Sequence, residues 1–251
     1  MLETNKIYNL DALEFLKQLD GKSVDLILTD PPYNIRWKQQ IELHGRKVMY
    51  HNFDELAGEN GWDVVDTKEL YDTLFKEFDR VVKDNGSVII FVRNEWITNC
   101  IDAGKKYKFD VKASIYWHKT NPVPQIRKKN YLSSVETIVW LARWNDDFCN
   151  FTFNFGMQKE MHNFIQMPLC GGDERSLHPT QKPLKLIRNF IKIHSNENDL
   201  ICDPFIGSGT TAVASIMENR NYIGCDNNES YFKIAQKRID ALPNTKLMQF
   251  A

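Results

Sequence analysis

The chain is 251 residues long, which is enough to bury one sizeable hydrophobic core. Its 32 basic residues nearly balance its 33 acidic residues, and the formal net charge is -1. This balance excludes a whole-molecule field that would draw the protein onto nucleic acid or a membrane, so any polyanion must be bound by a local patch.

Short apolar and β-branched runs alternate with helical patterns along much of the chain. In chain order, the expected elements are a strand at 7–10, a helix at 11–18, a strand at 24–28, a helix at 67–82, strands at 87–92, 109–117 and 135–141, a helix at 183–194, a strand at 200–202, a helix at 212–218 and a strand at 222–225. This alternation predicts a single α/β domain over 1–251, with a Rossmann-like, doubly wound, mostly parallel sheet of seven strands. No helical pattern separates 109–117 from 135–141, so these two strands are expected to form an antiparallel edge.

The cysteines and the apolar residues bear on the compartment. The five cysteines form no C-x-x-C pair, and an odd count at wide spacing favours reduced thiols over a disulfide framework or structural zinc. The N-terminus begins with polar residues, and no apolar run reaches about 18 residues. We therefore expect a soluble, cytoplasmic protein without a membrane span or a bound metal.

Two stretches do not follow the alternation. Residues 34–66 are polar, contain glycine and begin directly behind Tyr33, so they are expected to form a mobile functional loop. Residues 144–177 are rich in aromatic side chains and asparagine, and end near Gly171-Gly172. By composition alone, this second stretch is an insertion with its own small hydrophobic cluster.

The tetrapeptide Asp30-Pro31-Pro32-Tyr33 follows the strand at 24–28. The carboxylate of Asp30 and the carbonyl of Pro31 can each accept an N–H, and Tyr33 offers an aromatic face, so the motif suits a planar amine on a ring. Pro-Pro after a strand is also an ordinary way to end pairing and turn the chain. The motif alone therefore does not establish transfer to an exocyclic amino group.

A second motif lies between the strand at 200–202 and the helix at 212–218. Residues 203–211 read Asp-Pro-Phe-Ile-Gly-Ser-Gly-Thr-Thr. Gly207, Gly209 and Ala212 satisfy the G-x-G-x-x-A pattern of a nucleotide-binding turn. Asp226 closes the next strand near the offset of about 20 residues expected of a ribose-binding carboxylate. A nicotinamide-dependent oxidoreductase is therefore one interpretation.

Two observations weigh against the oxidoreductase. Too few residues follow Gly209 to build the rest of such a fold downstream. In addition, Asp203 and Phe205 place a carboxylate and an aromatic ring where a pyrophosphate would lie, which favours a cationic, phosphate-free ligand. S-adenosylmethionine is such a ligand.

Three motifs in one order carry a family resemblance. Asp-Pro-Pro-Tyr at 30–33 is followed by His-Pro-Thr-Gln-Lys-Pro at 178–183 and then by Phe-x-Gly-x-Gly-Thr at 205–210. This circularly permuted order, with the acceptor tetrapeptide before the cofactor loop, resembles the β group of DNA amino-methyltransferases. The resemblance spans residues 7–232 apart from the two irregular stretches.

The resemblance implies roles for individual residues. The catalytic residues would be Asp30, Pro31, Pro32 and Tyr33. The cofactor would be S-adenosylmethionine, bound by Asp11, Ala12, Asp30, His178, Thr180, Lys182, Asp203, Phe205, Gly207, Ser208, Gly209, Thr210, Thr211 and Asp226. Among these, Asp226 would bind the ribose, Asp11 would lie near the adenine, and Lys182 would be the counter-ion of the cofactor carboxylate. Helix-start roles are the alternatives for Asp11 and for Thr180 with Pro183.

The implied reaction is direct methyl transfer to adenine N6 in double-stranded DNA. Acceptors at Asp30 and Pro31 would favour a tetrahedral, nucleophilic nitrogen, so no covalent enzyme intermediate is needed. The base must leave the duplex, and stacking on Tyr33 would offset part of the unstacking cost. N4-cytosine methylation is the nearest alternative, although the family's cytosine members more often begin the tetrapeptide with Ser. An RNA or protein amine as acceptor and a DNA-binding module without catalysis are further alternatives.

Basic residues between positions 111 and 135 predict the contact with DNA. This stretch contains no acidic residue, and its candidate phosphate-binding side chains are Lys119, Arg127, Lys128 and Lys129. A solvated turn between edge strands is the alternative. The resemblance places target recognition in residues 144–177. It also implies one half of a restriction-modification pair with a cognate endonuclease, or a solitary bacterial-type modifier, and a homodimer as an open option.

Overall fold

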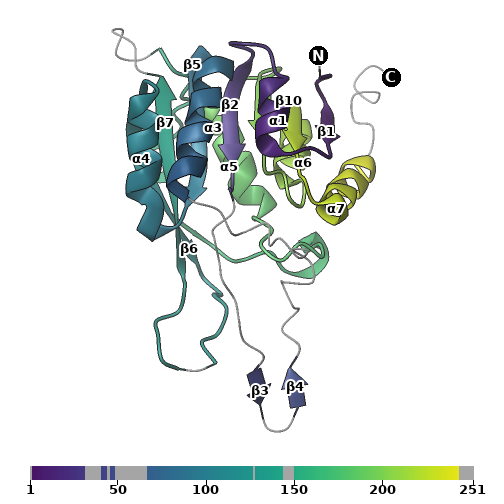
Figure 1. Cartoon of the computed structure of the whole chain (residues 1–251). Coiled ribbons are helices and arrows are strands. Elements are labelled where there is room, and N and C mark those ends of the chain that lie inside the picture. Colours follow the sequence, from purple (N-terminus) through teal and green to yellow (C-terminus); the bar gives the residue numbers. More distant parts are fainter. Residues whose placement is uncertain are drawn as a thin grey trace.

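The structure, a computed structural model, describes residues 2–31, 41–43, 46–48, 67–126, 128–143 and 150–242. An eight-stranded sheet runs through the molecule in the order β1-β10-β9-β2-β5-β7-β6-β8 (Figure 1). Its strands are β1 (Lys6–Tyr8), β2 (Val24–Thr29), β5 (Val82–Val92), β6 (Phe109–Lys119), β7 (Val135–Arg143), β8 (Phe164–Met167), β9 (Leu200–Asp203) and β10 (Asn221–Cys225). Two short strands, β3 (Ile41–Leu43) and β4 (Arg46–Val48), pair as a separate antiparallel hairpin.

The large sheet is mostly parallel. Parallel pairs join β1 to β10, β10 to β9, β9 to β2 and β2 to β5. Strand β7 runs antiparallel to both β5 and β6, and β8 lies parallel to β6. The predicted doubly wound α/β fold and its antiparallel pair are therefore confirmed, whereas the predicted count of seven strands in the sheet was one too low.

The additional strand is β8, which falls inside the stretch 144–177. Its four residues alternate between exposed and half-buried, which is a weak local pattern. Backbone pairing with β6 and a bond from the Trp117 indole Nε1 to the Met167 carbonyl oxygen, 2.9 Å long, hold it in place. Because these partners are more than 40 residues away in sequence, only the tertiary fold reveals this strand. The antiparallel pair is consequently not the outer edge of the sheet.

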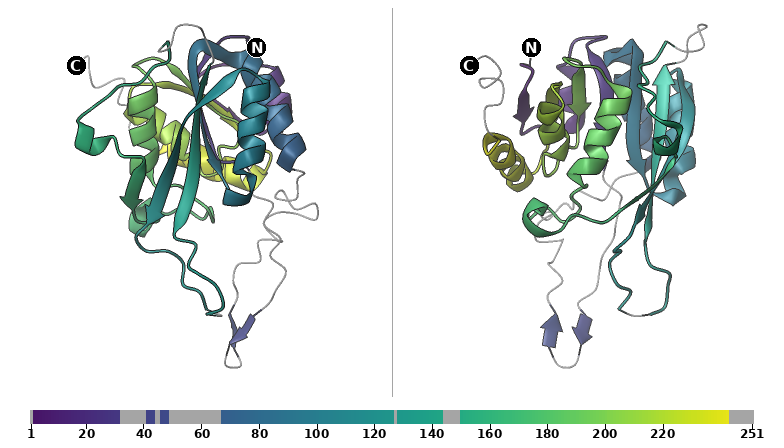
Figure 2. Two further views of the ribbon diagram at one scale, coloured as in Figure 1. Left: turned by 90° about the vertical axis from the view of Figure 1, so that its left-hand side faces the viewer. Right: turned by 180° about the vertical axis from the view of Figure 1, so that it is seen from behind.

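Helices cover both faces of the sheet (Figures 1 and 2). One layer consists of α1 (Ala12–Lys17), α3 (Thr67–Val81) and α4 (Ile97–Lys106), and the other of α5 (Leu184–His194), α6 (Thr210–Met217) and α7 (Glu229–Asp240). Helices α4 and α7 were not predicted. In α4 the buried positions are small residues, Cys100, Ala103 and Gly104, which contribute little apolar periodicity.

The core follows from the period-two geometry of the strands. In β2, Ile27 packs against the layer of α1 and α3, whereas its neighbours Leu26 and Leu28 pack against the layer of α5. Val24 departs from this alternation and joins the side of Ile27, because the register of β2 shifts between Val24 and Leu26. Strand β2 is buried along its whole length because it is covered on both sides, as a central parallel strand should be. Aromatic residues from 150–177 join this core: the Phe153 ring stacks on Trp140 at 4.9 Å between centroids. They do not form the separate cluster that composition suggested.

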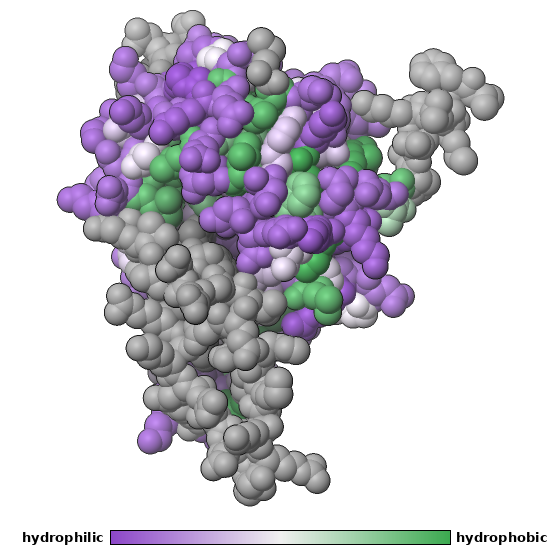
Figure 3. Space-filling model, turned by 45° about the vertical axis from the view of Figure 1, so that its right-hand side comes forward, coloured by the Kyte–Doolittle hydropathy of each residue, from purple (hydrophilic) through white to green (hydrophobic). Residues whose placement is uncertain are grey.

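The outer surface matches the balanced charge of the chain. On the face shown in Figure 3, the described surface is mainly hydrophilic, with apolar residues in small separate areas. Within the described ranges, none of the helices has the length and apolar character needed to cross a bilayer.

Candidate active site

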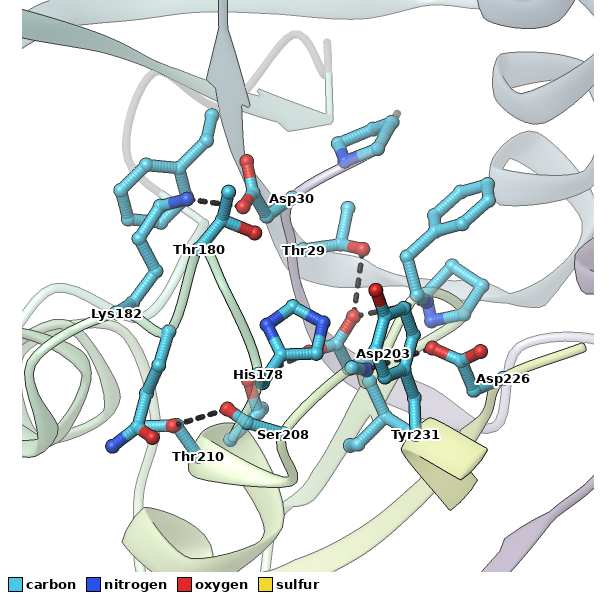
Figure 4. A pocket seen from close by; sticks show the side chains of 18 of the residues that line it. Thr29, Asp30, His178, Thr180, Lys182, Asp203, Ser208, Thr210, Asp226 and Tyr231 are labelled. Atoms are coloured by element: carbon cyan, nitrogen blue, oxygen red, sulfur yellow. Dashed lines mark hydrogen bonds and ion pairs between the residues drawn. The ribbon is translucent and has the colours of Figure 1, made fainter. Parts of the chain in front are cut away.

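Polar residues gather where parallel strands end. Asp30 follows β2, Asp203 ends β9 and Asp226 follows β10. Because these three strands are parallel neighbours in the sheet or separated by one strand, their carboxyl ends meet at one edge, which is where open α/β sheets bind ligands. One cavity at this edge is lined by all three aspartates, by Pro31, and by the loop that precedes α6 (Figure 4).

The loop before α6 has the tight turns that glycine allows. Gly207 and Gly209 have φ angles of 49° and 79°, in the left-handed region. A Cβ on Gly207 would lie 2.9 Å from His178 Nε2, and one on Gly209 would lie 2.9 Å from the Ala235 Cβ of α7. The glycines therefore let the backbone approach both the cavity wall and the helix behind it.

Asp203 is the buried centre of the loop. Its carboxylate accepts hydrogen bonds from the hydroxyls of Thr29 and Thr211, each 2.7 Å long, and from the backbone N–H of Phe205 at 3.1 Å. Burial raises the pKa of Asp203 to about 6, although these three donors act in the opposite direction. Asp203 consequently ties the end of β2 to the loop and takes up a proton at mildly acidic pH.

Asp226 braces the loop from the neighbouring strand. One carboxylate oxygen accepts the Gly207 N–H at 3.0 Å and the other accepts the Asn228 N–H at 2.8 Å. Burial raises its pKa to about 6 against the effect of these donors. Asp11 lies farther out, where its side chain caps α1 by accepting the N–H groups of Leu13 and Glu14, and it also lines the cavity with Ala12. The structural and the ligand-binding interpretations of Asp11 are thus compatible.

Residues 176–183 form a strap across the cavity. The His178 ring meets Tyr231 of α7 edge-on, with 4.3 Å between centroids. Burial, followed by the nearby charges of Lys182 and Arg238, lowers the pKa of His178 to about 4, so the imidazole is neutral at pH 7. Thr180 lines the same cavity.

The strap is fastened by Glu174 and not by Thr180. The Glu174 carboxylate accepts the Leu184 N–H, the first in α5, at 2.7 Å, and its carbonyl accepts the Gln181 side-chain amide at 2.8 Å. Pro183, which the sequence predicted as the first helical residue, is instead the N-cap residue of α5 and provides no side-chain cap. The expected capping role of Thr180 was therefore wrong.

Lys182 reaches the side of the cavity that Asp30 and Pro31 line, which we call the acceptor half. Its ammonium forms a close ion pair with Asp30 and lies 3.6 Å from the Glu136 carboxylate. Burial alone would lower the pKa of Lys182, but Asp30 and Glu136 outweigh burial and raise it. In the structure, Lys182 is thus paired with two carboxylates of the protein, and its role as counter-ion of a cofactor carboxylate stays a prediction.

The predicted catalytic and cofactor-binding residues fall into three groups. Those that line the one cavity are Asp11, Ala12, Asp30, Pro31, His178, Thr180, Lys182, Asp203, Phe205, Gly207, Ser208, Thr210, Thr211 and Asp226. Gly209 lies behind the cavity against α7. Pro32, Tyr33 and the loop at 34–66, apart from β3 and β4, lie outside the described residues, as does Arg127.

Several lining residues had no sequence signal of their own. Thr29 and Tyr231 were missed because a threonine at a strand end and a tyrosine in a helix are ordinary structural residues. Arg238 of α7, which does not line the cavity, was also missed as a support of the loop: its guanidinium donates to the Ser208 carbonyl at 2.6 Å and to the Thr210 hydroxyl at 3.0 Å. Only the fold shows that α7 supports the glycine loop from behind.

The candidate DNA-contact residues differ in their exposure to solvent. Lys119 is 9% exposed, and its ammonium pairs with Glu136 at 2.8 Å, so it faces inward and not toward a phosphate backbone. This placement removes Lys119 from the set of surface cations. Lys128 and Lys129 are exposed on the segment that joins β6 to β7.

The fold and the cavity define a class of protein. The sheet order, the glycine turn between β9 and α6, and an aspartate at the end of each adjacent strand are the features of an α/β enzyme that binds a nucleoside-containing ligand at its switch point. The close pair of Asp30 and Lys182 adds an acceptor half to the same cavity.

Comparisons with known proteins agree with this class. The sequence profile of the N6_N4_Mtase family, described as DNA methylase, matches residues 24–237. The Type II methyltransferase M.HinfI of Haemophilus influenzae is 31% identical over 253 residues, covering 94% of this chain and 68% of that protein. The Type II methyltransferase M2.DpnII of Streptococcus pneumoniae is 32% identical, covering 92% and 88%. The chain therefore belongs to the DNA methylase family.

Solved structures show the same fold. The crystal structure of an M1.HpyAVI-SAM complex is 30% identical and has a TM-score of 0.71, with 94% of this chain and 98% of that chain covered. The cytosine-N4-specific PvuII DNA methyltransferase has a TM-score of 0.73 over 99% and 92% of the two chains. At 18% identity, this second likeness concerns the fold alone.

Proposed function

We propose that this chain is an S-adenosylmethionine-dependent, sequence-specific DNA methyltransferase that modifies adenine N6 in flipped-out bases. One observation carries the proposal: the acceptor residues Asp30 and Pro31 and the glycine loop of residues 205–210 line one and the same cavity. A methyl acceptor and a methyl donor must meet for direct transfer. Sequence relatives that are Type II methyltransferases support the restriction-modification context.

The residues of the cavity fit S-adenosylmethionine. Asp203 and Asp226 offer negative charge to a cationic ligand, and the turn at Gly207 lets a ligand approach the backbone. Phe205 lines the cavity with an aromatic ring, which suits a cationic ligand without phosphate. When bound, the cofactor would supply an electrophilic methyl group on a sulfonium.

The acceptor half would position the amine of the target base. The Asp30 carboxylate and the Pro31 carbonyl would accept the two N–H groups of the amine. This would direct the nitrogen lone pair toward the donor half of the cavity, which is the glycine loop of residues 205–210. Charge that develops on the amine during transfer would be stabilised by the Asp30 carboxylate. Tyr33 would stack on the flipped base and offset part of the cost of unstacking, and Pro32 would keep the turn rigid.

The modified base is tested directly. DNA from a methylation-free host that expresses the chain is digested to nucleosides and analysed by mass spectrometry, and the same DNA is sequenced for its methylome. N6-methyladenine at one short sequence is expected. N4-methylcytosine would select the nearest alternative, and unmodified DNA would contradict the proposal.

Cofactor affinity should depend on pH through Asp203 and Asp226. Their pKa values of about 6 lie above the ordinary value, so ionisation of either carboxyl group destabilises the folded protein without its cofactor. The stability that these two groups contribute therefore falls as the pH rises from about 4 to 6. A cationic ligand prefers the ionised forms, so its affinity changes in the opposite direction. Calorimetric titration should show weaker binding of S-adenosylmethionine below pH 6, by up to about 10-fold per pH unit for each group. Asp226→Asn should flatten this dependence, whereas unchanged affinity from pH 5 to 8 would contradict it.

The exposed lysines between β6 and β7 should contribute affinity for DNA without sequence preference. The double variant Lys128→Ala/Lys129→Ala is expected to reduce the slope of log affinity against log salt by about 0.9 for each phosphate that these lysines neutralise. Lys22→Ala is the matched control, because exposed Lys22 lies before the start of β2, at the end of the sheet opposite the cavity. Fluorescence anisotropy with target and non-target duplexes measures both. Equal slopes for the double variant and the wild type would remove these lysines from the DNA-contact surface.

A restriction-modification enzyme also needs a target-recognition region, partners and a cellular location. Target recognition by residues 144–177, a cognate endonuclease that shares the site, a homodimer and a cytoplasmic location are each consistent with a restriction-modification enzyme. Co-purification with the product of an adjacent endonuclease gene tests the endonuclease partner, and light scattering of the purified chain tests the homodimer.

A further inference from the structure

Four charged side chains alternate in sign between the antiparallel pair and the cavity. Lys119 of β6 pairs with Glu136 of β7 at 2.8 Å, Glu136 lies 3.6 Å from Lys182 of the strap, and Lys182 pairs closely with Asp30. Their side chains are 11%, 20%, 8% and 22% exposed, respectively. We call these four residues the charge chain. Neither Lys119 nor Glu136 lines the cavity, so the chain extends beyond the site described above.

The charge chain is neutral as a whole. Burial of Glu136 would raise its pKa, but Lys182 and Lys119 outweigh burial and lower it, so Glu136 is an anion at neutral pH. Lys182 is a cation, because Asp30 and Glu136 raise its pKa against burial. Asp30 and Glu136 therefore share the ammonium of Lys182. Buried charges are costly unless they are paired, and each member depends on its neighbours.

Other groups surround the charge chain. Lys182 lies over the Phe91 ring at 4.9 Å, and Lys119 lies over Trp117 at 5.7 Å and donates to the Ser133 carbonyl at 3.3 Å. Asp203 from β9 and Tyr71 from α3 act electrostatically on Asp30. Tyr71 is neutral over any accessible pH range because burial raises its pKa. Asp203 titrates, and so does His178, whose pKa burial and the nearby charge of Lys182 lower to about 4; both residues are the same in the wild type and in every variant of the charge chain.

We propose that Glu136 is a positioning residue for methyl transfer, which holds Lys182 and takes up part of its charge so that Asp30 remains a strong acceptor for the target amine. Lys119 balances Glu136 from the other side. The inference rests on the proposed function, because it assigns Asp30 the role of amine acceptor. It adds two residues from the antiparallel pair, outside the three sequence motifs, to the reaction.

The sign of the charge at each end gives a sharp test. Glu136→Gln leaves an excess positive charge beside Asp30, which favours the ionised carboxylate and moves the acid limb of the single-turnover rate to lower pH. Lys119→Met leaves an excess negative charge and moves this limb to higher pH. Each displacement should be about one pH unit. The double variant Lys119→Met/Glu136→Gln is neutral again, and its acid limb should return to the wild-type position.

Rates and affinities separate positioning from damage to the fold. At saturating DNA and cofactor, Glu136→Gln should lower the rate on the order of 10-fold, because Lys182 and Asp30 lose their fixed geometry. The affinity for S-adenosylmethionine should stay within about 3-fold of the wild-type value. Glu136→Asp keeps the charge and should recover part of the rate with an unmoved acid limb. A purely structural role would lower the amount of folded protein without displacing the two limbs in opposite directions.

The outcomes distinguish this inference from the proposed function. If the acid limbs of the two single variants do not move, or move in the same direction, the role of Glu136 is overturned, while DNA from a host that expresses the wild-type chain still contains N6-methyladenine. If that DNA lacks N6-methyladenine, the proposed function itself is overturned. If the single variants do not fold, the neutral double variant decides: it should keep the wild-type limb with a reduced rate, and a wild-type rate would overturn the inference.

Discussion

Asp30→Asn should lower the single-turnover rate of methyl transfer by about 10²- to 10³-fold, which is the usual effect of removing one electrostatic contact to a developing charge. The substitution keeps the shape of the side chain but removes the charge that would accept the target amine. Lys182 would remain buried beside Glu136 alone. The rate should be measured with labelled S-adenosylmethionine at saturating cofactor and duplex, per folded molecule, so that weaker binding or folding does not enter the comparison.

A matched control lies on the same strand. Asp25 of β2 is buried, and its carboxylate accepts two bonds from Lys83, each 2.8 Å long. Asp25→Asn removes an ion pair of the same kind at the opposite end of β2, away from the cavity. It should lower the free energy of unfolding but leave the rate per folded molecule unchanged. Near-normal methylation by Asp30→Asn, or an equal loss in Asp25→Asn, would refute the assigned role of Asp30.

Gly209→Ala should lower both stability and cofactor binding. The φ angle of 79° costs a residue with a Cβ about 1–2 kcal/mol, and the new Cβ would lie 2.9 Å from Ala235 Cβ and 3.0 Å from Ala235 Cα. Overpacking against helix backbone adds about 1–3 kcal/mol, because α7 cannot yield as a side chain would. We therefore expect a loss of about 2–5 kcal/mol in the free energy of unfolding in urea. A displaced loop should also bind S-adenosylmethionine more weakly in calorimetric titration.

Gly172 separates the two contributions. Its φ angle is 57°, but a Cβ there would meet nothing within 4 Å. Gly172→Ala should therefore show only the conformational cost of about 1–2 kcal/mol and normal cofactor affinity. If the two variants lost equal stability, packing against α7 would have no part in shaping the glycine loop.

Much of the fold could be predicted because its signals are local. The apolar runs of β2, β9 and β10 and the amphipathic patterns of α3 and α5 lie within single stretches of the chain. Alternation of such elements specifies parallel strands with helices on both faces. Strand β8 and helix α4 escaped prediction because their identity depends on partners: β8 on backbone pairing with β6, and α4 on close packing of Gly104 against Leu141.

The site divides in the same way. The residues of the glycine loop and of the acceptor tetrapeptide can be recognised from spacing, since a tight turn and an amine acceptor need particular residue types in succession. The partners of the charged residues cannot. The sequence suggested DNA phosphates for Lys119 and a cofactor carboxylate for Lys182, yet both ammonium groups are buried against Glu136. A sequence does not show which carboxylate a long, flexible lysine side chain will meet.

The sequence by itself therefore determined the class of fold, the two halves of the cavity and their order along the chain, because these depend on periodicity and on contiguous motifs. The tertiary structure decided how the halves are joined. Lys182 of the strap reaches Asp30, and Glu136 of β7 reaches Lys182, only because the strap crosses the carboxyl edge of a sheet in which β5 alone separates β2 from β7. Coulombic pairing acts through space over a few ångströms, whatever the separation in sequence, and so the acceptor site and its charge balance exist only in the folded chain.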